Sequence, residues 1–357
     1  MRLLLRLLLL LLLLALFAGV GAYQYFQRWL STPLPLPEEG LEYHLTAGKT
    51  LSHLVRELAK EDVLAYPRAL SLYARWMGQT QVRVGEYELL PSTTPLELLA
   101  MLNRGDVKSY RATLVEGRNF SQIIDLLATH PRLQSQLKGK PLAEQLAILD
   151  LPIEHPEGWF FPDTYYYVAG DTDVVILRRA YHRMMVTLEE LWPQRMFGLP
   201  YESPYEALIM ASIVERETGA PWERGKIAGV FVRRLQQGMR LQTDPTVIYG
   251  MGDAYSGRIT YSDLRAPTEY NTYVIHGLPP TPIAMPGREA IHAALHPEAG
   301  EALYFVAKGD GTHVFSATLA EHNAAVKAYQ RQRASDYRST LQALPPAEQS
   351  EQGAGEE

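Results

Sequence analysis

The sequence predicts an α+β protein in three parts: an N-terminal transmembrane helix, a small α/β subdomain and a larger α+β domain. One observation is the apolar run that begins the chain. Another is that helical and strand-like hydrophobic periods alternate along the rest of the chain, separated by capping and turn signals. The third is size, because 357 residues, 46% of them hydrophobic, can bury a sizeable core in one large or two smaller domains.

The N-terminal run has the composition of a membrane span. Arg2 and Arg6 precede an almost pure Leu, Ala, Phe and Val segment from residue 7 to about residue 22, and aromatic residues continue it to Trp29. This length is close to the roughly 20 residues that cross a bilayer, and Tyr and Trp favour the bilayer interface. We therefore expect an uncleaved, single-pass anchor over residues 7–29.

The charges beside the anchor predict its orientation. Arginines precede the span and few cations follow it, so by the positive-inside rule residues 1–6 are cytoplasmic and the body of the chain is exported. A cleaved signal peptide is the alternative, because Ala18 and Ala22 are small residues of the kind found at cleavage sites. The length of the segment and its aromatic edge favour the anchor.

Composition excludes several function classes. The net charge is −6 and no basic cluster follows the first residues, so nucleic-acid binding is not expected. The chain has no cysteine, which excludes disulfides, thiol nucleophiles and cysteine-ligated zinc. Its ten histidines form no HExxH or similar pair, so we expect no metal site and no cofactor.

A small subdomain is expected at residues 43–106, after a linker at residues 30–42. The linker contains the proline-rich string STPLPLPEE, which predicts a stiff, extended spacer. We interpret the subdomain as β-rich with two short helices. Its predicted elements are helices over 50–60 and from about 66–67, a strand over 82–89, and a helix to about 103 opened by the capping box of Thr94 and Glu97.

The larger domain is expected over residues 107–335. Its predicted elements are a strand over 110–115, helices over 119–129, 142–149, 173–192, 205–218 and 222–237, a β-hairpin with strands over 302–307 and 312–315, and a last helix capped by Thr318 and Glu321. Gly225 and Gly229 permit close approach of a neighbouring backbone. Residues 336–357 form a polar, acidic tail, rich in Pro and Gly from about Leu344, that we expect to be disordered.

The most informative segment is 206–219, a mostly apolar helix that ends with two carboxylates, Glu215 and Glu217, before Gly219 as a C-cap. At about 100° per residue, Glu217 shares a sector of the helix with apolar residues, whereas Glu215 points nearly the opposite way. We expect Glu217 on the buried face and Glu215 on the solvent face. Burial and the negative end of the helix dipole would both raise the pKa of Glu217, as a general acid requires.

Two alternatives to a catalytic Glu217 stay open from the helix alone. The carboxylate could instead pair with a nearby arginine such as Arg216, Arg224 or Arg240, since structural ion pairs also perturb pKa values. Glu206 lies on the same face about three turns earlier and is a weaker candidate acid.

Four other segments are rich in groups that bind polar, ring-shaped ligands. They are EGWFFPDTY (157–165), LQTDPTVIYG (241–250), EYNTY (269–273) and HGLPPTPIAMPG (276–287), the last with too many prolines for regular structure. Aromatic faces stack on sugar C–H surfaces while amides and hydroxyls bind ring substituents, so together these segments suit an oligosaccharide groove. A packed core with hydrated loops is the alternative for each segment taken alone.

Together these segments resemble the endolytic murein transglycosylase family (MltG, YceG-like). The matching strings are LVEG (114–117), EGWFFPDTY (157–165), ASIVERET (211–218), GMRLQTDPTVIYGMG (238–252), YNTY (270–273), GLPPTPIAMPG (277–287) and HPEAGEALYFVAKGDGTHVFSATLAEHN (296–323). The resemblance covers the chain from the anchor to about Tyr329, and the long run over 238–252 makes it specific.

The resemblance implies an inner-membrane enzyme whose periplasmic domain cleaves the glycan strands of nascent peptidoglycan internally. The family's catalytic glutamate matches Glu217, and its membrane-proximal unit is LysM-like, which corresponds to residues 43–106. In a lytic transglycosylase one carboxyl protonates the leaving glycosidic oxygen and then takes the proton of the muramyl C6 hydroxyl, which closes a 1,6-anhydro ring. The residues we expect to bind the sugar or to stabilise oxocarbenium-like charge are Gln242, Asp244, Tyr270 and Asn271.

Two other functions are the alternatives. In a hydrolase, Asp244, Glu157 or Asp163 would activate water, and the products would carry reducing ends. A non-enzymatic wall tether would bind glycan through the small subdomain and the aromatic segments and release no fragments. The resemblance also suggests peptidoglycan synthases as partners, with cleavage ending strand growth.

Overall fold

The computed structural model describes residues 2–46 and 48–331, which form two compact units. Of these residues, the first unit holds 2–46, 48–112, 130–134 and 166–172, and the second holds 113–129, 135–165 and 173–331. Helices and two-stranded sheets make up both, which confirms the predicted α+β class. The predicted tail at residues 336–357 lies outside the described residues.

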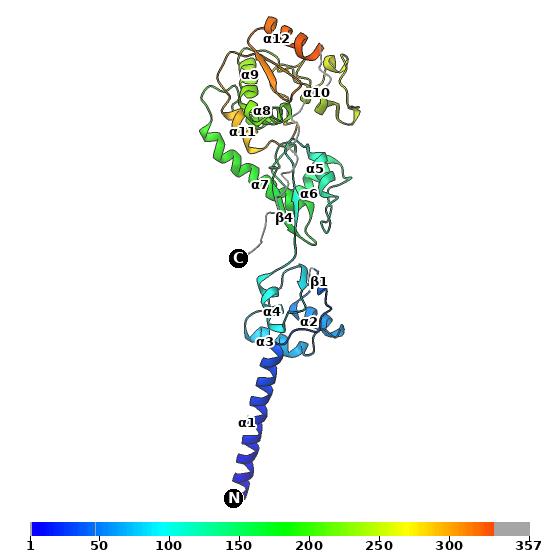
Figure 1. Ribbon diagram of the computed structural model, residues 1–357, viewed down its shortest axis with the longest axis vertical. Coiled ribbons are helices and arrows are strands. Elements are labelled where there is room, and N and C mark those ends of the chain that lie inside the picture. The colour runs from blue at the N-terminus through cyan, green and yellow to red at the C-terminus, as the bar shows by residue number, and fades with distance from the viewer. Residues whose placement is uncertain (1, 47, 332–357) are drawn as a thin grey trace, which may run out of the picture. The chain divides into compact units, whose positions relative to one another are not determined.

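The N-terminal apolar run forms α1 (Arg2–Leu30), a helix of 29 residues. Its stretch Leu4–Leu30 (blue in Figure 1) is long and apolar enough to cross a membrane, and its most apolar window has a mean hydropathy of 2.6 and no buried residue. The last turn of α1 behaves differently, because Leu30 is only 1% exposed and Phe26 and Trp29 pack against the same core. The apolar helix therefore runs without a break into the packed part of the first unit.

The first unit is built on one antiparallel pair, β1 (Leu41–Leu45) with β2 (Gly85–Leu89). Three helices accompany the pair: α2 (Leu51–Lys60), α3 (Pro67–Trp76) and α4 (Pro95–Arg104). The predicted β-rich character is therefore wrong. The three helices have ten residues each, whereas the two strands have five each. The strand expected over 82–89 is also shorter than predicted, since β2 begins only at Gly85.

The proline-rich segment also differs from the expected free spacer. Leu34 is buried in the core of the first unit, and its N–H donates a hydrogen bond of 2.8 Å to the carbonyl of Thr93. The next residue, Thr94, forms the predicted capping box with Glu97 at the start of α4. The proline-rich segment therefore packs next to the start of α4, through the buried side chain of Leu34 and its backbone hydrogen bond.

The strands β3 (Ser109–Thr113) and β4 (Thr164–Val168) pair with each other, and the boundary between the two units falls within them. The sequence predicts β3 but not β4. The segment EGWFFPDTY (157–165), which overlaps the start of β4, is expected from the sequence to bind a ligand. In the structure Tyr165 and Tyr167 are instead buried core residues.

The second unit is mostly helical, with one β-hairpin. Its helices are α5 (Phe120–Leu127), α6 (Leu142–Leu149), α7 (Asp173–Leu191), α8 (Pro204–Glu217), α9 (Arg224–Gln236), α10 (Asp244–Met251), α11 (Arg288–Leu295) and α12 (Leu319–Val326), and its hairpin is β5 (Tyr304–Ala307) with β6 (His313–Ser316). All but α10 and α11 match predicted elements. These two have eight residues each and lie beside proline-rich or polar segments, which hides their helical period.

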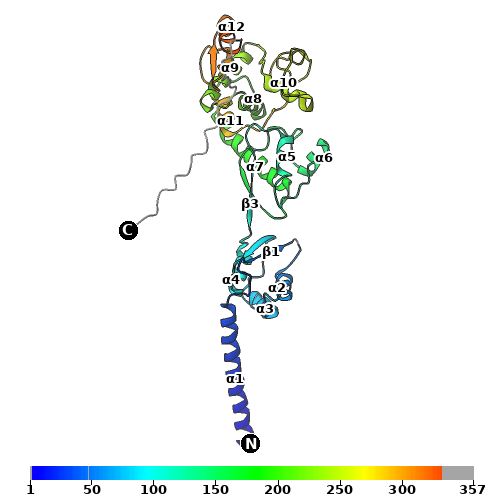
Figure 2. The same ribbon diagram turned by 45° about the vertical axis from the view of Figure 1, so that its right-hand side comes forward.

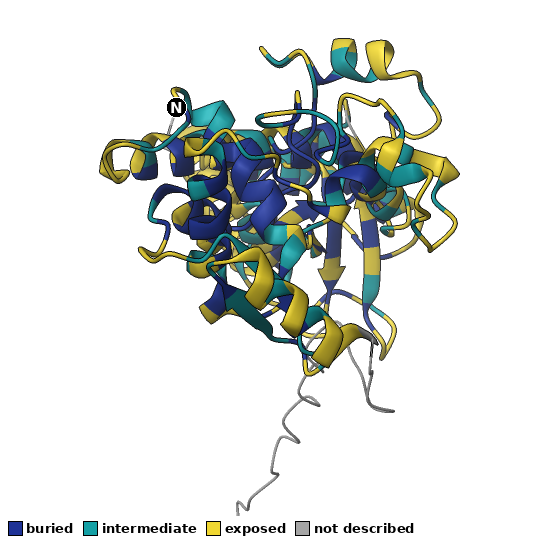
Figure 3. Ribbon diagram, turned by 90° about the horizontal axis from the view of Figure 1, so that it is seen from above, coloured by how far each residue is buried: buried dark blue, intermediate teal, exposed yellow. Residues whose placement is uncertain are grey.

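Helix α8 is the centre of this unit. It packs against α9 and α11, and the three lie together in both views (Figures 1 and 2). Every residue from Ala207 to Val214 is buried, on all sides of the helix, and Figure 3 marks such buried stretches in dark blue. A helix that is apolar all round in this way belongs to the interior, so α8 has no solvent face over these turns.

Helix α9 packs closely against the chain near Glu298, as the predicted role of its glycines requires. A Cβ added at Gly229 would lie 2.4 Å from the carbonyl oxygen of Glu298. One turn earlier, the N–H of Glu298 donates a hydrogen bond of 2.9 Å to the carbonyl of Gly225. The prediction of close backbone approach is confirmed at Gly229.

Candidate active site

The site is centred on Glu217, the last residue of α8. The helix stops there because Thr218 adopts extended backbone, with φ of −141°, and its hydroxyl accepts a hydrogen bond from the N–H of Ala220. The predicted C-cap, Gly219, is therefore wrong, since a polar Thr turn ends the helix. The carboxyl of Glu217 accepts a hydrogen bond from the hydroxyl of Thr243, the residue that precedes α10.

The surroundings of Glu217 favour its protonated form. Burial raises the pKa of Glu217 to about 7. The hydrogen bond from Thr243 lowers this pKa, the negative charge of Asp244 raises it, and the positive charge of Arg216 lowers it. The carboxyl thus holds a proton near neutral pH and can also release one, which is the property of a group that acts as acid and then as base.

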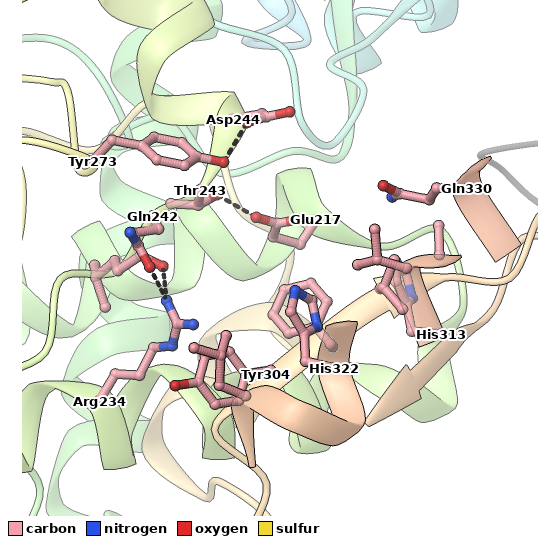
Figure 4. Close-up of a pocket in the computed structure, with 16 residues that line it drawn as sticks. Glu217, Arg234, Gln242, Thr243, Asp244, Tyr273, Tyr304, His313, His322 and Gln330 are labelled. Carbon is pink, nitrogen blue, oxygen red and sulfur yellow. Dashed lines mark hydrogen bonds between the residues drawn. The ribbon is translucent and has the colours of Figure 1, made fainter. Parts of the chain in front are cut away.

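Glu217 lines a cavity of about 540 Å³, the Glu217 cavity. On one side of it lie residues from the end of α8 and the start of α10, and on the other lie β5, β6 and α12. Figure 4 shows Glu217 in the wall formed by α8 and α10, with dashed lines joining Thr243 to Glu217 and Tyr273 to Asp244. The residues of the opposite wall include Tyr304, Phe305, His313, His322 and Gln330.

Gln242 lines the Glu217 cavity in a strained backbone conformation. Its φ is +52°, which is uncommon for a residue other than glycine. The backbone N–H of Gln242 donates to the carbonyl of Thr272 at 3.1 Å, and its side-chain oxygen accepts from Nη1 of Arg234 at 3.3 Å. Arg234 is itself buried and also donates to the carbonyl of Leu241 at 2.8 Å. The buried guanidinium of Arg234 therefore stabilises the backbone turn at Leu241 and Gln242, which lines the cavity.

Asp244, the first residue of α10, also lines the Glu217 cavity. Its Oδ1 accepts a hydrogen bond of 2.7 Å from the hydroxyl of Tyr273. The sequence-predicted residues Glu217, Gln242 and Asp244 are thus brought together at one cavity.

Asn271 and Tyr270 lie elsewhere. Asn271 is fully buried, donates from Nδ2 to the carbonyls of Asp263 and Ala266, and accepts from the N–H of Tyr273 at 3.0 Å. Its side chain shapes the loop that carries Tyr273 and does not line the Glu217 cavity. Tyr270 lines a second cavity described below.

Glu215 is not on a solvent face, so this expectation is wrong. Its side chain is 6% exposed, lies 3.3 Å from Nη2 of Arg224, and accepts a hydrogen bond of 3.0 Å from the N–H of Gly287. Arg224 therefore pairs with Glu215, the other carboxylate of the pair. Glu206, the weaker candidate acid, accepts from the N–H of Glu202 at the opposite end of the helix.

Two residues at the Glu217 cavity, His313 and Glu223, were not predicted from the sequence. His313 lines the cavity, and its Nδ1 lies 2.7 Å from Oε2 of the buried Glu223. The backbone N–H of His313 donates to the other carboxylate oxygen at 3.0 Å. Glu223 thus fixes both the ring and the main chain of His313. Ninety residues separate the two in sequence, so no local pattern links them.

A second, larger cavity of about 830 Å³ contains Tyr249, Tyr255, Tyr270, Glu157 and Arg216 in its wall, and we call it the Tyr249 cavity. Glu157 is 3% exposed and accepts hydrogen bonds from the N–H of Phe120 and, at 3.1 Å, from the hydroxyl of Tyr249. Burial raises the pKa of Glu157 to about 7, against the lowering effect of these hydrogen bonds.

The candidate water-activating residues of a hydrolase are therefore dispersed. Glu157 lines the Tyr249 cavity, and Asp163 lines neither cavity. Only Asp244 of the three shares a cavity with Glu217. Within residues 2–46 and 48–331 no cluster of three His, Cys, Asp or Glu side chains could hold a metal ion.

Comparison with known proteins gives one consistent family. A sequence model of the YceG-like family matches residues 43–328. An endolytic murein transglycosylase of Bacillus subtilis (strain 168) is 31% identical over 326 residues, which are 87% of this chain and 90% of the relative. One of Streptococcus pneumoniae serotype 2 is 25% identical over 80% of this chain and 58% of its own length.

A solved structure also resembles this fold. The crystal structure of a putative yceG-like protein from Listeria monocytogenes is 31% identical, with a TM-score of 0.50, and the match covers 81% of this chain and 99% of that one. The match to solved structure and the match to curated relatives therefore point to the same family.

Proposed function

Because the chain belongs to the YceG-like family, we propose that it is an endolytic peptidoglycan lytic transglycosylase, a carbon–oxygen lyase acting on a polysaccharide. It cleaves the bond between N-acetylmuramic acid and N-acetylglucosamine within nascent glycan strands and leaves 1,6-anhydro-N-acetylmuramic acid ends. The observation that carries the proposal is a single carboxyl, Glu217, whose pKa is raised to about 7 in the wall of a cavity.

Glu217 would perform both proton transfers. In its protonated form it donates the proton to the leaving glycosidic oxygen as the bond from that oxygen to the muramyl C1 breaks. As a carboxylate it then removes the proton of the muramyl C6 hydroxyl, whose oxygen bonds to C1. No water is consumed and Glu217 ends protonated, so one acid suffices, unlike in glycosidases that use two carboxylates.

Neighbouring residues support this assignment. The hydroxyl of Thr243 holds the carboxyl of Glu217 in place, and Asp244 and Gln242 line the same cavity. The negative charge of Asp244 would stabilise the oxocarbenium-like charge that develops at C1. Gln242 would hydrogen-bond the sugar. Asn271, which is buried and does not line the cavity, would act as a positioning residue through the loop of Tyr273.

We extend the proposal to localisation. The apolar helix α1 supports a single-pass anchor in the inner membrane, with the N-terminus cytoplasmic and the remaining chain periplasmic. The membrane-proximal unit at residues 43–106 would be LysM-like. Cleavage of nascent strands beside peptidoglycan synthases would end their elongation.

The test is digestion of purified glycan strands by the full-length protein and by Glu217→Gln, with mass spectrometry of the products. The wild type should release fragments with anhydro ends, and Glu217→Gln should be slower by about two to four orders of magnitude, because it keeps the shape of the side chain without the proton. Fragments with reducing ends would identify a hydrolase instead. Binding to sacculi with no soluble fragments would identify a tether.

A further inference from the structure

We propose that the Tyr249 cavity binds the glycan strand beyond the bond cleaved at Glu217, so that the enzyme holds sugars on both sides of the cleavage point. The ligand is an N-acetylated polysaccharide that carries acidic peptide side chains. This inference rests on the proposed function of Glu217 and adds a binding site to it.

The two cavities are lined by neighbouring residues of the chain. Glu217 lines one cavity, and its neighbour in α8, Arg216, lines the other. Asp244 lines the first cavity, and its neighbour in α10, Pro245, lines the second. Consecutive Cα atoms are about 3.8 Å apart. The end of α8 and the start of α10 thus border both cavities, each with residues that are consecutive in the chain.

The wall of the Tyr249 cavity contains aromatic side chains. At about 830 Å³, the Tyr249 cavity is as large as cavities that enclose small ligands. The rings of Tyr249 and Tyr270 lie 4.9 Å apart at 60°. The hydroxyl of Tyr249 donates to Glu157 at 3.1 Å, and that of Tyr270 lies 2.9 Å from the hydroxyl of Thr281. Both rings are therefore fixed before a ligand arrives, which lowers the entropy lost on binding.

A third ring, Tyr255, lines the same cavity and is half-buried. An aromatic side chain of this kind can offer a face to the C–H surface of a sugar ring while its edge stays in water. Tyr249 and Tyr270 pack against the core of the second unit, whereas Tyr255 does not, so Tyr255 is the ring that can be changed with the least disturbance of that core.

The wall of the Tyr249 cavity also contains cationic side chains. Of the cations in the wall, Lys138 lies 3.1 Å from a carboxylate oxygen of Asp125, and Lys140 pairs with Glu144. Arg216 is exposed, and its Nη1 donates to the carbonyl of Gly117 at 3.0 Å. A guanidinium has five N–H donors, so Arg216 keeps donors for a carboxylate. The stem peptides on muramic acid supply such carboxylates.

The experiment measures kcat/KM of the full-length protein in detergent micelles for two substrates, peptidoglycan tetrasaccharides and long glycan strands. Tyr255→Ala is expected to lower the long-to-short ratio about tenfold, because only long strands reach the second cavity. Tyr255→Phe should keep most of the ratio, because stacking does not need the hydroxyl. Tyr261→Ala is the matched control, since Tyr261 is 82% exposed and lines neither cavity.

A second arm compares long strands with and without their stem peptides. Arg216→Gln should lower the preference for peptide-bearing strands about fivefold, since only these strands carry carboxylates for the guanidinium, whereas the hydrogen bond to Gly117 is lost with both substrates. The effect of Arg216 on the pKa of Glu217 applies to both substrates at a fixed pH, so it cancels in this ratio. Thermal unfolding of each variant checks that the fold is retained.

The inference and the proposed function fail in different ways. A long-to-short ratio in Tyr255→Ala equal to that of the wild type, with anhydro products still formed, overturns the inference alone. So does an equal loss on long and short substrates. Wild-type products that carry reducing ends overturn the proposed function, whatever the ratio.

Discussion

Thr243 donates a hydrogen bond from its hydroxyl to Oε1 of Glu217, and this contact joins two helices. Glu217 ends α8, and Thr243 precedes the first residue of α10. Because α10 also contributes Asp244 to the Glu217 cavity, the position of the acid and that of its neighbouring charge are set by one contact. The geometry of the site therefore depends on α10 as much as on the helix that carries the acid.

Replacing Thr243 by Val should change the pH dependence of cleavage. The first proton transfer needs protonated Glu217, so wild-type activity should fall as the pH rises through about 7. The hydrogen bond of Thr243 lowers the pKa of Glu217, and its removal should move this fall to higher pH. The turnover number should drop about tenfold because the carboxyl is less well held. A pH profile of kcat checks both, and a shift to lower pH would contradict the assignment.

Glu217→Gln should stabilise the protein at alkaline pH. The pKa of Glu217 is about 7 in the folded state, above the value of about 4.3 in an unfolded chain. The folded state therefore binds the proton more tightly, and its free energy of unfolding falls as the pH rises from about 4.3 to about 7.

Glutamine does not ionise, so the variant escapes this loss. It should gain roughly 2 kcal/mol over the wild type between about pH 5 and about pH 8. Urea denaturation of both proteins at the two pH values measures the gain. If the free energies of unfolding of variant and wild type differ by the same amount at both pH values, the pKa of Glu217 is not raised in the folded state.

Glu223→Gln should destabilise the wall of the Glu217 cavity. Glu223 is buried, accepts a hydrogen bond from the backbone N–H of His313 and lies 2.7 Å from the ring Nδ1 of the same residue. An amide there replaces the carboxylate and restricts the ring to the tautomer whose Nδ1 carries no proton. A loss of about 1–3 kcal/mol in the free energy of unfolding is expected. Glu301→Gln, at an exposed position, is the control and should change stability by less than about 0.5 kcal/mol.

Gly229→Ala should also destabilise the second unit, by about 1–3 kcal/mol, because the added Cβ would lie 2.4 Å from the carbonyl oxygen of Glu298. The matched variant is Gly225→Ala in the same helix, where the nearest atom would be 3.7 Å away, an ordinary contact. Alanine favours a helix over glycine, so this variant should be neutral or slightly stabilising. Thermal unfolding of the pair checks the contrast, and equal effects would contradict close packing at Gly229.

The helical wheel places Glu217 on a buried face and Glu215 on a solvent face. In the structure Glu217 is half-buried in the wall of its cavity, whereas the side chain of Glu215 is covered by the loop over 276–287 and by Arg224. A helical wheel describes one isolated helix and contains no information on the segments that pack around it. The family resemblance, by contrast, is confirmed over residues 43–328.

What the sequence could not give are contacts between distant segments. The link of His313 to Glu223 spans 90 residues, and the positive φ of Gln242 depends on a buried arginine and on the carbonyl of Thr272. Short elements such as β1 and α10 are stabilised by their neighbours and carry little period of their own. Both kinds of information appear only once the chain is folded.

The burial of Leu30 at the end of α1 has a mechanical consequence. The last turn of the apolar helix belongs to the core of the first unit, so no flexible linker separates the helix from this core. A tilt or rotation of the helix must therefore turn the core with it. A soluble version trimmed just after Leu30 would lose part of its hydrophobic interior, whereas one that begins before Phe26 would keep it.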